Sequence, residues 1–148
     1  MSELPKVGVA GGFIEAYRAW CNFYGTQASE ELIQYVTDSV ERIPFVLDLS
    51  YCPGIEPGTN IAFDLKPVFQ ALRYNSYFLG LRLCGVTVSG VIQLLAPCLK
   101  VNRVLTRLHL RNLVSLVFLF NPTHYTIFNH IIIIVNSEAL DCFRFCFV

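Results

Sequence analysis

The chain has 148 residues, no net formal charge, 54% apolar residues and 15% charged residues. Because an ordinary soluble domain carries about 25% charged residues, this composition excludes a disordered chain, a collagen, a long solvated coiled coil and an overall basic nucleic-acid-binding protein. Six cysteines are scattered without a secretory signal ahead of them. This predicts an intracellular protein with buried thiols rather than a disulfide framework.

Charge divides the chain into three predicted parts. Residues 1–41 hold two basic and six acidic groups, residues 42–113 hold eight and three, and residues 114–148 hold one and two. No acidic residue lies between Leu65 and Ser137, where seven cations occur. We therefore expect different roles for the three parts.

Residues 1–41 are predicted to be a helical linker and N-terminal cap. Aromatic residues at spacings of three and four indicate one face of an amphipathic helix, namely Phe13, Tyr17, Trp20 and Tyr24. Gly25 fits the end of that helix. Ser29 is expected to cap a second helix, although Ile33 and Tyr35 also fit a strand.

Residues 42–113 contain an internal repeat, whose period is the interval from Leu81 to Leu108. The repeat places Leu81-Arg82-Leu83 over Leu108-His109-Leu110 and Asn75 over Asn102. A third Leu-x-Leu at 47–49 precedes Leu81 by a somewhat longer interval, with a turn-rich loop between them. Each Leu-x-Leu predicts a short strand with its leucines pointing inward.

Apolar spacing predicts a helix before each of the last two strands. The first is expected at 63–74, capped by Asn60 or Asp64, and the second is expected from 91 to 99. Pro97 predicts a kink or an early end in the second helix. This pattern predicts an α/β fold: a leucine-rich-repeat solenoid of the ribonuclease-inhibitor-like type, as a short fragment with an N-terminal helical cap.

Three stretches of the chain resemble the CARMIL proteins, a family of leucine-rich-repeat regulators of actin capping protein. The likeness spans residues 11–113 and is carried by Gly11-Gly12-Phe13 with Tyr17, Cys21, Gly25 and Glu30-Glu31, by residues 71–75 with Phe78, and by residues 102–105 with Leu108 and Leu110. It implies a non-catalytic scaffold fragment without a cofactor, belonging to an F-actin-uncapping protein. The implied partners are proteins of the actin cytoskeleton, and the implied location is the cytoplasm, at the cytoskeleton and the cell cortex near the plasma membrane.

Residues 114–148 form an apolar tail in which Phe, Ile, Val and Leu supply 18 of 35 positions. A translated intron is the favoured interpretation, since Val114-Ser115 is what a splice donor encodes in frame. A capping unit and a membrane helix are the alternatives, and polar residues such as Asn121 and His124 argue against the helix. The run 131–135 is predicted to promote aggregation.

No catalytic or metal constellation is predicted. His124 and His130 precede Cys142 and Cys146, which is not the usual order of zinc ligands. The strongest candidate for a binding site is a group of cations on one side of the predicted strands: Arg82, Arg107, His109 and Arg111. An acidic protein segment or a phosphoinositide suits it, whereas nucleic acid does not, because no aromatic residues are interleaved.

Two other functions remain open at this stage. The chain fits a repeat fragment of another intracellular leucine-rich-repeat protein, such as a receptor or a GTPase regulator. It also fits a membrane-anchored protein that uses the apolar tail.

Overall fold

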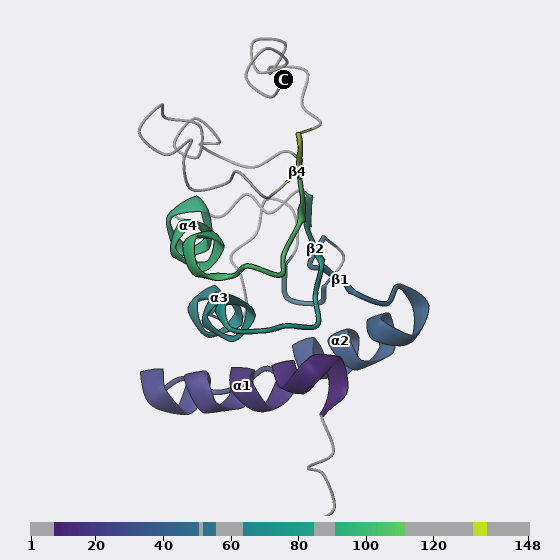
Figure 1. Cartoon of the computed structure of the whole chain (residues 1–148). Helices are drawn as coiled ribbons and strands as arrows, with labels where there is room; N and C mark the ends of the chain where they lie inside the picture. The colour runs from purple at the N-terminus through teal and green to yellow at the C-terminus, as the bar shows by residue number, and fades with distance from the viewer. Residues whose placement is uncertain (1–7, 51, 56–63, 85–90, 112–131, 136–148) are drawn as a thin grey trace, which may run out of the picture.

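A computed structural model describes residues 8–50, 52–55, 64–84, 91–111 and 132–135. Its elements follow in the order α1 (Val9–Tyr24), α2 (Glu30–Arg42), β1 (Val46–Asp48), α3 (Leu65–Arg73), β2 (Gly80–Cys84), α4 (Val91–Val101), β3 (Arg107–Arg111) and β4 (Ile132–Val135). Figure 1 shows α3 and α4 stacked along one side of the strands, with α1 and α2 across the end of the stack.

The strands form one parallel sheet in chain order, β1-β2-β3-β4. Leu81 lies opposite Leu108, and Leu47 lies opposite Leu81, so both predicted intervals between the Leu-x-Leu segments are confirmed as strand registers. The leucines at alternate positions have no exposed surface and belong to the core, namely Leu47, Leu49, Leu81, Leu83, Leu108 and Leu110. The intervening side chains lie on the opposite side of the sheet, which we call the open face.

The predicted leucine-rich-repeat solenoid is wrong. The described residues form four helices and one small open parallel sheet, which is a short α/β fragment. A solenoid stacks at least about three similar units, each burying its apolar side on the next. Within the described ranges only α3–β2 and α4–β3 share one period, because the interval from Leu47 to Leu81 is longer than that from Leu81 to Leu108.

Helix α1 begins with a tight left-handed turn. Ala10, Gly11 and Gly12 all have positive φ angles, of 53°, 67° and 83°. Gly11 also approaches Tyr77 so closely that an added Cβ would lie 2.8 Å from the Tyr77 Cβ. This position therefore requires glycine for both conformation and space. The turn sets the direction in which α1 crosses the end of the stack.

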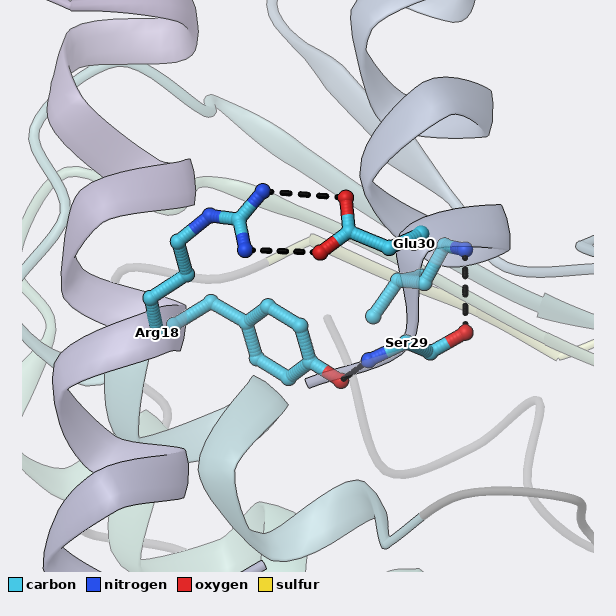
Figure 2. A network of polar contacts seen from close by, with 5 residues as sticks. Arg18, Ser29 and Glu30 are labelled. Carbon is cyan, nitrogen blue, oxygen red and sulfur yellow. Dashed lines mark hydrogen bonds and ion pairs between the residues drawn. The ribbon is translucent and has the colours of Figure 1, made fainter. Parts of the chain in front are cut away.

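The junction between α1 and α2 follows the sequence prediction. Gly25 ends α1 at φ 68°, and the Ser29 hydroxyl accepts a hydrogen bond from the Leu32 N–H at the start of α2. Figure 2 shows Arg18 and Glu30 in a two-pronged ion pair across this junction, with N–O distances of 2.7 and 3.0 Å. The strand alternative for residues 30–42 is wrong, because Leu32, Val36 and Ser39 form one buried helical face.

Helices α3 and α4 cover the leucine side of the sheet. Asp64 caps α3 by accepting a hydrogen bond from the Lys66 N–H at 2.9 Å, and the predicted inward residues Leu65, Val68, Phe69 and Leu72 are buried. Helix α4 continues beyond Pro97 to Val101, so the predicted early end is wrong. Cys98 and Leu99, just after the proline, are fully packed in the core, which holds the helical path.

Only β4 is described within the apolar tail. Its backbone pairs with β3 in parallel, with Ile133 opposite Leu108 and Ile134 opposite His109. The other tail residues, including those weighed for zinc and as a translated intron, lie outside the described residues.

Candidate binding face of the sheet

The strands bring three of the four predicted binding residues to the open face. Alternation along β2 and β3 sends Leu81, Leu83, Leu108 and Leu110 to the core, and it leaves Arg82, Arg107 and His109 on the opposite side. The register places Arg82 directly opposite His109. Arg111 ends β3 at a position on the same face, but its side chain lies outside the described residues.

Arg82 is already held by an acid of this chain. Its Nη1 lies 3.3 Å from Asp48 Oδ2, on the neighbouring strand β1. Asp48 is 6% exposed, and its Oδ1 accepts a hydrogen bond from the Ser50 N–H at 2.9 Å. The open face therefore carries a row of three polar side chains on three neighbouring strands: Asp48, Arg82 and His109.

Sequence reasoning missed Asp48 as a member of this site. The signal was present, because Asp48 is the middle residue of the first Leu-x-Leu, just as Arg82 and His109 are of the second and third. The sequence alone did not show that Arg82 has an acidic partner within this chain. The structure shows one carboxylate already bound at this position.

Two nitrogens on the open face lack a hydrogen-bond partner within the described part of the chain. These are Arg82 Nε and His109 Nε2, and both are buried. The remainder of the Arg82 side chain is more open, with 41% of its surface exposed. Arg107 is exposed as well, and no ion pair to it occurs among the described residues. The exposed parts of the Arg82 and Arg107 guanidinium groups can be offered to an incoming oxygen anion.

The described thiols are not suited to chemistry. Cys21, Cys52 and Cys98 are free and buried, which confirms the expectation of buried thiols for these three. Burial raises the pKa of the Cys52 and Cys98 thiols to about 12 in each case. Since the thiolate is the reactive form, thiols with such raised pKa values are inert near neutral pH.

The same part of the chain shows no grouping of three or more His, Cys, Asp or Glu side chains that would hold a metal ion. Among the helices described, none has the length and apolar character needed to cross a bilayer.

Comparison with known proteins adds no relative. Neither the models of known protein families nor the set of curated proteins contains a match to this chain.

Proposed function

We propose that this chain is a non-catalytic interaction scaffold whose open face binds an acidic segment of a partner protein. The observation that carries the proposal is the Asp48–Arg82 ion pair beside His109. This pair shows that an arginine of the open face binds a carboxylate from a neighbouring strand. Arg107, exposed on the same face without an acid neighbour among the described residues, offers the next carboxylate site.

The expected affinity is modest. Exposed ion pairs contribute only about 0–1 kcal/mol each, and their attraction weakens as salt shortens the screening length. Arg82 contributes less than a free arginine because Asp48 already neutralises much of its charge. A partner with several acidic residues in sequence would use Arg107, His109 and Arg111 together.

The resemblance of residues 11–113 to CARMIL proteins supplies the biological setting of the proposal. In that setting the chain is part of a regulator of actin capping protein and of actin filament organisation. Its partners are proteins of the actin cytoskeleton, in the cytoplasm near the cell cortex. This assignment rests on the motifs that carry the resemblance.

A pull-down with purified actin capping protein as the probe tests the proposal. The full chain should retain capping protein weakly, and the retained amount should fall as salt rises. Arg107→Glu should abolish retention, whereas Arg103→Glu, the same charge change at an exposed turn residue, should preserve it. Equal retention by both variants, or no retention by the unaltered chain, would contradict the proposal.

Uncapping is a separate activity that this chain should lack. In the CARMIL family it needs an extended segment that wraps capping protein, and such segments are polar and rich in charge. The tail 114–148 has only Glu138, Asp141 and Arg144 as charged residues. A pyrene-actin assay should therefore show no uncapping, and strong uncapping by the chain would overturn this scaffold role.

A further inference from the structure

A second recognition surface lies on the opposite side of the sheet, between α3 and α4. A hollow of about 120 Å³ opens there, which we call the α3–α4 groove, lined by Lys66, Phe69, Gln70, Arg73, Gln93, Leu94, Pro97 and Cys98. A cavity of about 150 Å³ is enough to hold a benzene ring. The groove is somewhat smaller than that, which suits an aliphatic side chain such as leucine.

The polar lining of the groove favours an anion. Lys66 and Arg73 supply two cations, Gln70 and Gln93 supply amides, and no carboxylate is among the lining residues. Arg73 Nε is buried and has no hydrogen-bond partner within the described ranges. The nearest acidic residue along the chain is Asp64, whose carboxylate caps α3 through the Lys66 N–H, and no further acid follows it before Glu138.

An aromatic cluster extends this surface onto α1. Trp20, Phe23 and Tyr24 have ring centroids 5.2–5.8 Å apart, and Phe23 is 74% exposed. The Lys66 ammonium lies 4.5 Å from the centre of the Tyr24 ring, which joins the cluster to the groove. Exposed aromatic side chains beside a pocket are typical anchors of protein–protein contacts.

The two cations have a defined spacing. Lys66 and Arg73 are two turns apart on α3, which corresponds to about 10 Å along a helix axis. Side chains of an extended peptide alternate between its two faces, so two that share a face with a third midway between them are four residues, or about 13 Å, apart. Two glutamates at that spacing would reach the two cations through their flexible side chains, with an apolar side chain midway between them on the same face, over Phe69, Leu94 and Pro97.

From this match we propose that the α3–α4 groove docks an extended acidic segment of a partner protein, with one apolar anchor residue between two carboxylates. The carboxylates pair with Lys66 and Arg73, and the anchor fills the groove. This site is independent of the open face, because the helices and the arginines of β2 and β3 lie on opposite sides of the sheet.

Fluorescence anisotropy with a labelled peptide containing Glu-Ser-Leu-Ser-Glu tests the docking site on the full chain. Two comparison peptides contain Glu-Ser-Ser-Ser-Glu, which lacks the anchor, and Lys-Ser-Leu-Ser-Lys, which lacks the acids. The first peptide should bind at least about tenfold more tightly than either comparison, because both recognition elements are then satisfied. Equal binding of all three peptides would overturn the proposal.

Variants locate the site. Lys66→Glu and Gln70→Glu should each lower the affinity for the Glu-Ser-Leu-Ser-Glu peptide by about tenfold or more, and Gln70→Glu changes charge with almost no change in volume. Lys100→Glu, an exposed residue of α4 outside the lining, and Arg107→Glu on the open face should leave affinity unchanged. If Arg107→Glu lowers the affinity for the peptide and Gln70→Glu does not, the groove proposal is overturned, and the open-face proposal is still tested by its own pull-down.

Anionic lipid vesicles separate the peptide from a membrane as the occupant, since aromatic and cationic side chains together also favour membrane surfaces. The groove proposal expects peptide binding to persist in the presence of such vesicles. Binding to vesicles without any binding to the peptide would refute it.

Discussion

Two asparagine side chains, Asn75 and Asn102, make the same connections in successive units. Asn75 Oδ1 accepts hydrogen bonds from the Tyr77 and Phe78 N–H groups, and its Nδ2 donates to the Ala10 carbonyl. Asn102 repeats this with Val104 and Leu105, and its Nδ2 donates to the Leu72 and Asn75 carbonyls. Their match in the sequence therefore has a physical cause: each pairs with buried backbone groups that need a partner.

Asn102→Ala tests the importance of these bonds. The change leaves buried N–H and carbonyl groups unpaired, and each such group costs about 1–3 kcal/mol. We expect the free energy of unfolding to fall by at least about 2 kcal/mol, measured by urea denaturation. Asn22→Ala, at an exposed position of α1, should change it little. Similar losses for both variants would contradict the role of Asn102.

Tyr17 links the two N-terminal helices at the residue scale. Its hydroxyl accepts a hydrogen bond from the Ser29 N–H at 3.0 Å. Burial raises its pKa from 10.0 to about 12, and burial likewise raises the pKa of Tyr35 to about 12. Because these pKa values are higher in the folded state, the stability they contribute is complete below pH 10 and is lost as pH rises toward 12.

Tyr17→Phe should separate the effect of the hydrogen bond to Ser29 from the effect of the raised pKa on stability. At neutral pH the variant should be less stable by about 1 kcal/mol, since the Ser29 N–H loses its acceptor. Between about pH 10 and 11.5 its stability should fall less steeply than that of the unaltered chain, because one titrating group is gone. Denaturation midpoints across this pH range give the measurement. Tyr74→Phe, at an exposed ring, serves as control, and a steeper decline for Tyr17→Phe would refute the assignment.

At the element scale, the sequence predicted most boundaries because local signals agreed with packing. Gly25, Ser29 and Asp64 act at helix ends as their chemistry requires. The early helix end predicted from Pro97 was wrong because tertiary contacts of Cys98 and Leu99 hold α4 in helical form past the proline. The left-handed turn at Ala10 was not predictable, since alanine has no local preference for that conformation; Asn75, far along the chain, fixes it through the Ala10 carbonyl.

Gly11→Ala should be more destabilising than Gly25→Ala. Both glycines have positive φ, and an alanine in that conformation costs about 1–2 kcal/mol. An added Cβ at Gly25 meets nothing within 4 Å, whereas one at Gly11 meets the Tyr77 Cβ at 2.8 Å. Thermal denaturation should show the larger loss for Gly11→Ala. Equal losses would mean that α1 does not pack against Tyr77 as described.

At the scale of the whole molecule, one sheet separates two surfaces of different character. The strand registers were predictable, because Leu-x-Leu recurs at 47–49, 81–83 and 108–110, but the solenoid inferred from them is wrong, because only two of the described units share one period. The candidate face was predictable for Arg82, Arg107 and His109 from strand alternation. The Asp48 pairing was not, because it depends on which strand lies beside β2.

Strand β4 makes the outer edge of the sheet a predicted site of aggregation. Its Ile-Ile-Ile-Val backbone is last in the strand order, and apolar β-branched edges promote pairing between chains. Ile134→Lys lies at the register of His109 on the open face. It should increase the amount of non-aggregated protein recovered from size-exclusion chromatography. Ile133→Lys, at the register of Leu108 on the core side, should lower stability. The reverse ranking would contradict this register.

Zero-length carbodiimide cross-linking tests most directly whether the open face binds an acidic partner. The Arg107→Lys variant places a reactive amine on this face, and Arg103→Lys places one at the exposed turn before β3. With purified actin capping protein, position 107 should be linked to an Asp or Glu of capping protein, and position 103 should not. Links from position 103, Lys66 or Lys100, with none from position 107, would contradict the account.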